Sequence, residues 1–231
     1  TNDGGTVSLT PENLAAIENV TSLDVSEKNL SDLSGIEYFV NLRSLDCQKN
    51  QLTSLNVSSL TELSILYCQY NQLTTLDVSQ NTALSNLNCS NNQLTELNVA
   101  KNPKLQTLSC ANNQLTALDI EKNTLLSTLY CNNNHLATLD VSNNTALTKL
   151  YCHANRMSKL DVKNNLKLKA LYCGAQTTDD VSTSQTLKLT LPAELRSIWK
   201  GTNDLNKDVD VITDGMSVNH GGFEDGGTVE W

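Results

Sequence analysis

The chain contains 231 residues and carries a formal net charge of −9, from 16 basic and 25 acidic side chains. Such an acidic chain attracts phosphate groups poorly, which argues against nucleic acid and anionic lipid as partners. No apolar run approaches the ~18 residues of a membrane-spanning helix, so no membrane span is expected. Leucine and asparagine dominate, with 38 and 29 copies against 2 Phe and 2 Trp, which predicts a core built by repetition.

The N-terminal segment is expected to cap whatever follows it. Thr10 suits an N-cap and Pro11 the first helical position, so a short helix is predicted over Thr10–Asn19. The chain begins at Thr1, without an initiator Met or a charged-then-apolar leader. This beginning indicates that a targeting segment has been removed or that the chain was trimmed. Residues 1–19 are assigned to an N-terminal cap.

Residues 20–176 form a tandem repeat, which the cysteines make plain. Each cysteine follows the previous one by 21 residues: Cys47, Cys68, Cys89, Cys110, Cys131, Cys152 and Cys173. The unit over Leu105–Leu125 reads LQTLSCANNQLTALDIEKNTL, and the common pattern is LxxLxCxxNxLTxLDVSxNTx. A fixed period over this much sequence predicts a solenoid in which each unit forms one coil.

The constant positions of the unit predict its local structure. Leu and Cys alternate with polar residues, which indicates a strand with one buried face. We expect the cysteines to be buried free thiols, because side chains on parallel strands point alike rather than at each other. One Asn column should satisfy backbone groups and bond to the neighbouring coil: Asn50, Asn71, Asn92, Asn113, Asn134 and Asn155. A second column is expected at the return turn, where Asn tolerates unusual backbone angles: Asn81, Asn102, Asn123, Asn144 and Asn165.

This pattern resembles the bacterial leucine-rich repeat proteins, in particular internalin-like surface and secreted proteins. It follows their LxxLxLxxNxL signature, with Cys in place of one strand Leu. The segment Val20–Asn41 looks like a 22-residue internalin-type unit, with Val25 in place of Cys and Lys28 in place of Asn. The resemblance implies an α/β-type right-handed leucine-rich repeat solenoid of about eight coils, with a parallel concave β-sheet, few helices and caps at both ends. It also implies a secreted or cell-surface location.

The repeat pattern breaks down after Cys173, where Gln176 replaces the ladder Asn. Two segments alternate like strands, Thr186–Leu191 and Asp208–Ile212. Between them PAELRSIWKG places apolar residues on one helical face and ends in glycine, so a helix is predicted there. Residues 177–231 are assigned to a C-terminal cap or a small flanking module.

No catalytic group, metal site or cofactor is expected. The histidines, His135, His153 and His220, have no nucleophile motif or acid pair beside them. Neither Cys131 nor Cys152 belongs to a paired ligand set with zinc spacing. Three acidic or amide residues before Val209 have calcium-loop spacing, but Val209 stands where such a loop needs glycine. A further column is expected to bond to backbone N–H groups in its own turn: Asn56, Asp77, Asn98, Asp119, Asp140 and Asp161.

The outward strand position between Leu and Cys carries the candidate binding residues. From coil to coil it reads Asp46, Tyr67, Asn88, Ser109, Tyr130, Tyr151 and Tyr172. The last three form a tyrosine ladder with ~4.8 Å between neighbouring strands, and Lys149 and His153 lie beside it. Such tyrosines either staple neighbouring strands together or anchor a ligand, and both alternatives stand.

Three functions follow for this face. The resemblance favours a non-enzymatic, monomeric module that binds a protein partner through the concave face. A glycan ligand is the first alternative, because tyrosines with Asn and Gln neighbours can stack on sugar rings. A structural spacer that presents the C-terminal segment is the second. The expected binding residues are Tyr67, Tyr130, Tyr151, Tyr172, His153 and Lys149.

Overall fold

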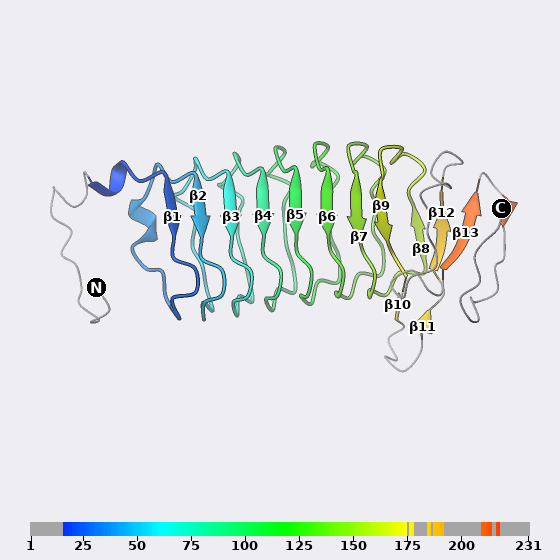
Figure 1. The fold of residues 1–231 in the computed structure, drawn as a ribbon, viewed down its shortest axis with the longest axis horizontal. Helices are drawn as coiled ribbons and strands as arrows, with labels where there is room; N and C mark the ends of the chain where they lie inside the picture. The colour runs from blue at the N-terminus through cyan, green and yellow to red at the C-terminus, as the bar shows by residue number, and fades with distance from the viewer. Residues whose placement is uncertain are drawn as a thin grey trace.

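The structure is a computed structural model, and it describes residues 16–174, 176–177, 184–185, 187–191, 209–213 and 216–217. Eight short strands lie side by side in one parallel sheet that follows the long axis of the molecule (Figure 1). They are β1 (Ser22–Asp24), β2 (Ser44–Asp46), β3 (Ile65–Tyr67), β4 (Asn86–Asn88), β5 (Thr107–Ser109), β6 (Thr128–Tyr130), β7 (Lys149–Tyr151) and β9 (Ala170–Tyr172). This arrangement confirms the predicted leucine-rich repeat solenoid.

Each coil contributes one strand, and the strands pair in register. Leu108 of β5 lies opposite Leu87 of β4 and Leu129 of β6, so identical positions stack in columns. We number the coils by their residues: 20–41, 42–62, 63–83, 84–104, 105–125, 126–146, 147–167 and 168–176 are coils 1 to 8. The half of each coil opposite its strand is called the return side.

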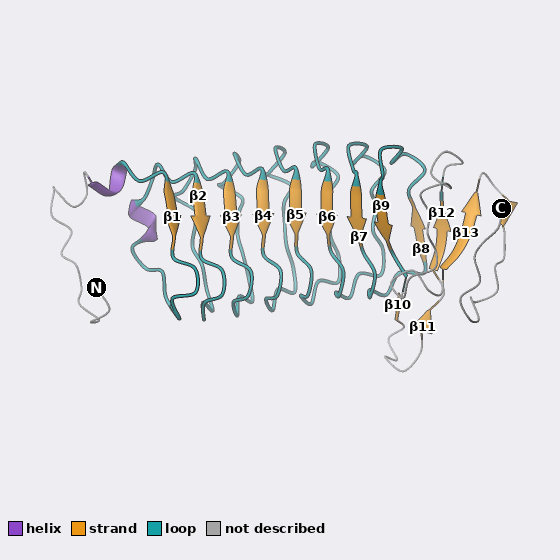
Figure 2. Ribbon diagram, in the orientation of Figure 1, coloured by secondary structure: helices purple, strands orange, loops and turns teal. Residues whose placement is uncertain are grey.

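The return side is extended rather than helical. Twenty-one residues must close a full circuit, so little chain remains for a helix after the strand and its turns. Among the described residues, helix is limited to residues 16–18 and the 3-10 helix η1 (Ile36–Tyr38) (Figure 2). The first lies within the predicted Thr10–Asn19 helix, whose earlier residues are outside the described part. No helix there is long and apolar enough to cross a bilayer.

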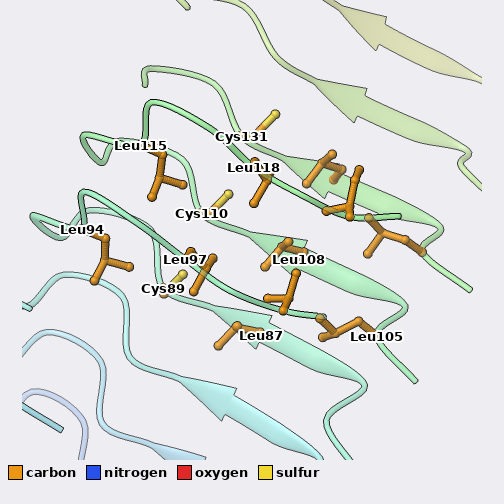
Figure 3. Close-up of a cluster of buried hydrophobic side chains, with 14 of the residues drawn as sticks. Leu87, Cys89, Leu94, Leu97, Leu105, Leu108, Cys110, Leu115, Leu118 and Cys131 are labelled. Carbon is orange, nitrogen blue, oxygen red and sulfur yellow. The ribbon is translucent and has the colours of Figure 1, made fainter. Parts of the chain in front are cut away.

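The core lies between the sheet and the return side. Leu87, Leu105 and Leu108 point into it together with Leu residues of the return side, such as Leu94 (Figure 3). All seven cysteines are free and fully buried in this core, as expected. The thiol of Cys89 donates to the backbone oxygen of Ser109 in the next coil at 3.6 Å. Cysteine therefore acts as a small apolar side chain with a weak hydrogen-bond donor.

The first Asn column, which we call the strand ladder, connects neighbouring coils as predicted. In Asn92, Oδ1 accepts from the backbone N–H of Leu73 at 3.0 Å. Its Nδ2 donates to the carbonyl oxygens of Cys68 and Cys89 at 3.0 and 3.1 Å. Backbone groups left over by the turn are thereby paired inside the core.

The strand ladder continues one coil further than the sequence pattern indicated. Gln176 is buried, and its Oε1 accepts from the N–H of Met157 at 3.0 Å. Its Nε2 donates to the carbonyl oxygens of Cys152 and Cys173 at 3.1 and 2.7 Å. The expectation that the repeat breaks down at this position was therefore wrong, because a longer amide reaches the same three partners as Asn.

The second Asn column has a different role from the one expected. Asn102 is fully buried, and its Nδ2 donates to the carbonyl oxygens of Val78 and Asn81 at 3.0 and 2.9 Å. None of its members has a positive φ; within the described part, that conformation occurs after the strands, at Glu27, Asn29, Lys49, Tyr70, Asn91, Asn112, Asn133 and Ala154, and at Gly35. The column is thus a second ladder that binds backbone carbonyls, and unusual backbone angles do not explain it.

Beyond coil 8 the chain continues along the return side. Strand β8 (Lys159–Asp161), on the return side of coil 7, pairs in parallel with β12 (Leu187–Thr190), and β12 pairs in parallel with β13 (Val209–Thr213). These last two are the strands expected in that region. Strand β14 (Met216–Ser217) is antiparallel to β13, while β10 (Gln176–Thr177) and β11 (Ser184–Gln185) form a separate hairpin-like pair.

The contact between β8 and β12 brings buried leucines of β12 into the hydrophobic core of the coils. Leu189 lies opposite Leu160, and both side chains are buried. The predicted helix over residues 192–201 lies outside the described residues, as does the partial calcium pattern before Val209. Leu187, Leu189 and Leu191 belong to the same buried cluster as the leucines of the coils, so the core extends to β12 on the return side.

Candidate binding face

The outward face of the eight-stranded sheet, called the sheet face below, is built from the alternation of each strand. In β5, Leu108 points inward while Thr107 and Ser109 point outward and are half-buried. A third outward position follows the inward Cys, and in coil 5 it holds Ala111. Every coil therefore adds three side chains to the sheet face, and neighbouring coils place them in three columns.

Tyrosines occupy the middle column at the C-terminal end of the sheet face. The ring centroids of Tyr130 and Tyr151 lie 4.8 Å apart, and those of Tyr151 and Tyr172 lie 4.5 Å apart. The ring planes are tilted by 42° and 31°, which is the offset arrangement that aromatic pairs prefer. We call this group the tyrosine patch. Tyr67, also expected at the site, stands apart on β3, with β4 and β5 between it and Tyr130.

Two expected residues flank the tyrosine patch on β7 and just after it. Lys149, the first residue of β7, is exposed. Burial lowers the pKa of His153, and Asn133 donates its backbone N–H to the His153 carbonyl oxygen at 3.1 Å. Partial burial also raises the pKa of Tyr151, with the neighbouring rings of Tyr172 and Tyr130 adding to this effect. No Asp or Glu occupies the outward positions of coils 6 to 8, so Lys149 is the charged neighbour of the patch.

A hollow opens on the sheet face between Tyr67 and Tyr130. Its volume is about 360 Å³. Asn88 and Ser109 hold the middle column there, so the two large rings are separated by two small polar side chains. The sequence contains a signal for this hollow, because two small residues stand between two tyrosines in the middle column. The hollow was not predicted, since only the tyrosines themselves were taken as candidate binding residues.

Beside the hollow, three polar side chains form a hydrogen-bonded chain across coils 2 and 3. Gln48 donates from Nε2 to a carboxylate oxygen of Asp46 at 2.8 Å and accepts from Nε2 of Gln69 at 2.6 Å. The Oε1 atom of Gln69 is buried and has no hydrogen-bond donor within the described residues. One acceptor in the wall of the hollow is thus left unsatisfied.

An exposed aromatic residue, Tyr70, directly follows Gln69 in coil 3. Tyr70 is 54% exposed and has a φ of 57°, in the left-handed region. The same turn position holds Asn91, Asn112 and Asn133 in the next three coils. Asparagine adopts this conformation readily, whereas a bulky side chain is strained there.

The return side also has hollows, which are larger but differently built. One of them, of about 570 Å³, lies beside β8 and is lined by residues that include Asp140, Asp161, Lys159 and Lys163. Its carboxylates are already engaged, since Asp140 accepts from the N–H of Ser142 and Asp161 from that of Lys163. These turns match the prediction for this Asp/Asn column. No three His, Cys, Asp or Glu residues in the described part are grouped to hold a metal ion.

Comparison with known proteins identifies the class of fold. No family model matches the sequence, and no curated protein is similar to it. A solved leucine-rich repeat protein of Leptospira interrogans has a TM-score of 0.67 at 24% identity, over 89% of this chain and 51% of that one. The chain therefore has the leucine-rich repeat fold.

Internalins of Listeria monocytogenes are also similar. Internalin C2 has a TM-score of 0.64 at 21% identity, over 87% of this chain and 83% of that one. The functional domain of InlJ, described as including a cysteine ladder, is 27% identical with a TM-score of 0.46, over 87% of this chain and 55% of that one. The chain spans about half the length of the InlJ and Leptospira structures. It thus shares its fold with internalins and other bacterial leucine-rich repeat proteins.

Proposed function

We propose that this chain is a non-enzymatic binding module that holds a protein partner against the tyrosine patch of the sheet face. The observation that carries the proposal is the stack of Tyr130, Tyr151 and Tyr172 on three adjacent strands. Together they offer a continuous aromatic surface with polar tips, which is the chemistry enriched at protein interfaces. Tyrosine also loses little conformational entropy on binding, because it has few rotatable bonds.

The charge around the patch favours an acidic partner surface. On the sheet face of coils 6 to 8, the outward positions hold no Asp or Glu, and Lys149 is exposed there. A carboxylate of the partner can approach Lys149 without meeting a like charge. Because such a contact lies at the rim of the interface, it should speed association more than it strengthens the complex.

The setting we propose is outside the bacterial cell, either secreted or at the cell surface. Support comes from the shared fold with internalins and from the resemblance of the repeat pattern to that group. Binding as a monomer is part of the same proposal. The terminal segments, residues 1–19 and 177–231, would then serve as caps of one repeat domain.

The test compares two alanine variants for binding to a partner isolated by affinity capture. Tyr151→Ala removes the central ring and should weaken binding by at least ~2 kcal/mol, about 30-fold, if that ring is a hot spot. Thr116→Ala, at an exposed position on the return side, should bind like the wild type. Tyr151→Phe keeps the ring and separates the contribution of the hydroxyl.

A stability measurement on the same variants distinguishes the two roles of the ladder. Loss of ring contacts predicts that Tyr151→Ala also unfolds at a lower denaturant concentration, whether or not it binds a partner. Normal binding by a folded Tyr151→Ala variant would show that the tyrosines staple the strands and that the partner binds elsewhere.

A further inference from the structure

We propose that the hollow between Tyr67 and Tyr130 binds one uncharged pyranose unit of a glycan. This site lies mainly on coils 2 to 5 and shares only Tyr130 with the tyrosine patch. It is a separate binding activity, and it does not depend on the proposed protein interaction.

The shape of the hollow fits one sugar ring between two aromatic rings. Tyr67 and Tyr130 stand three strand spacings apart, about 14 Å at ~4.8 Å per strand. Asn88 and Ser109 leave the space between them open, with a volume of about 360 Å³. This volume is near the lower end of small-molecule sites, roughly 300–1,000 Å³.

The lining matches the chemistry of a sugar. Hydroxyl or amide side chains line the floor, from Asn86, Asn88, Thr107 and Ser109. Sugar hydroxyls both donate and accept hydrogen bonds, and amide and hydroxyl side chains do the same. The C–H faces of the ring can pack against Tyr67 or Tyr130 at either end.

An unsatisfied acceptor also points to a ligand that donates hydrogen bonds. Oε1 of Gln69 has no donor within the described residues, although its Nε2 is held at 2.6 Å by Gln48. A buried acceptor without a partner costs free energy, so it is expected to gain one when the site is filled. A hydroxyl that displaces the Gln69 side chain slightly would supply this donor.

The charge of the hollow selects against acidic sugars. Asp46 is the only carboxylate in the lining, and no Lys, Arg or His lines it. An anionic sugar, such as one bearing a carboxylate or sulfate, would meet the Asp46 carboxylate with no compensating cation. Neutral hexose and N-acetylhexosamine units carry no such penalty.

The experiment screens the whole chain against neutral and acidic oligosaccharides on a glycan array. Binding is then measured in solution by saturation-transfer NMR with the neutral oligosaccharides of glucose, galactose, mannose and N-acetylglucosamine. We expect binding of at least one neutral series and none of the purely acidic ones. Absence of neutral binding in both assays, or binding of acidic glycans only, would overturn the proposal.

A space-filling variant locates the site. Ser109→Tyr should fill the hollow while keeping the fold, because four other coils carry Tyr in this column. We expect it to weaken sugar binding at least tenfold, whereas Thr116→Tyr on the return side leaves it unchanged. Asn88→Leu, which keeps the side-chain size but removes the amide, is the second variant and should also weaken binding tenfold. If folded variants at both positions bind like the wild type, the sugar site is elsewhere.

These results are independent of the protein partner. Tyr172→Ala, in the tyrosine patch, leaves Tyr130 packed against Tyr151 and should bind the neutral sugar normally. Loss of partner binding with retained sugar binding in that variant would separate the two activities.

Discussion

The side-chain oxygen of Asn113 accepts a hydrogen bond from the backbone N–H of Leu94, one coil earlier, at 3.0 Å. The amide nitrogen of the same side chain donates back to Cys89 of that earlier coil, also at 3.0 Å, and to Cys110 of its own coil at 3.1 Å. One side chain therefore holds two coils together through groups that are all buried. The solenoid depends on such links because its strands are only three residues long.

Replacing Asn113 with Ala should destabilise the protein by about 1–3 kcal/mol, since buried backbone groups lose their partners. Thr116→Ala is the matched control, because Thr116 is exposed in the same coil. Asn91, a surface position one coil earlier, is a poor control: its φ of 55° means that Ala there adds strain of its own. Urea denaturation measures the effect, and equal midpoints for the two Ala variants would contradict a structural role for the ladder.

The cysteines should be inert in the folded protein. Burial raises the pKa of Cys47 and of Cys89 to about 12, so the reactive thiolate is scarce at neutral pH. A chromogenic thiol reagent should label none of the seven rapidly until denaturant is added, after which all seven should react. Fast labelling under native conditions, or a mass lower by two protons per bridge, would show that the thiols are accessible or oxidised.

Ala154→Asn should stabilise the protein by up to about 1 kcal/mol. Ala154 has a φ of 51°, and three equivalent turns carry Asn, which adopts this conformation at lower cost. The control is Ala137→Asn at an exposed position that lacks a positive φ. Thermal unfolding should show a higher midpoint for the first variant only; an equal or lower midpoint would mean that the left-handed turn carries little strain.

Stability should depend on the protonation of His153. Burial lowers its pKa in the folded state below the ordinary value of 6.5, so the unfolded chain binds the proton more tightly. The stabilising contribution is therefore complete above about pH 6.5 and is lost as the pH falls below it. His153→Asn, which copies Asn132 of the preceding coil, should flatten the stability profile between about pH 7 and pH 5. Thr116→Ala, an exposed position without a titratable group, should leave the wild-type slope.

The repetition in the sequence was enough to predict the fold of the coils. A strand, a buried Cys and a ladder Asn recur every 21 residues, so the place of Leu108 or Asn113 in one coil fixes that of its equivalents in the others. The prediction failed where the residue type changed at a constant position. Gln176 was interpreted as the end of the strand ladder, but its side-chain amide makes the same hydrogen bonds as an Asn.

The return-side pairing of the C-terminal segment was beyond the reach of the sequence. Leu189 pairs with Leu160 across a separation of 29 residues, which differs from the period of the repeat. A strand was predicted over Thr186–Leu191, but none was predicted around Leu160. Pairing between non-equivalent positions depends on the path of the chain after coil 8, which the repeat pattern does not specify. The hollow was not predicted for a different reason. Asn88 and Ser109 are ordinary surface residues in the sequence, and they leave an open space only because Tyr67 and Tyr130 stand on either side of them.

Because coils 2 to 7 all have 21 residues, equivalent side chains on the sheet face are separated by a constant step from coil to coil. Deleting residues 84–104 removes one step and keeps each column aligned, so the two rings at Tyr67 and Tyr130 would move closer by one strand spacing, ~4.8 Å. Duplicating the same stretch would move them apart by an equal step. Gain or loss of whole coils would therefore change the distance between two binding residues, and so the size of the ligand they accommodate, without changing the core.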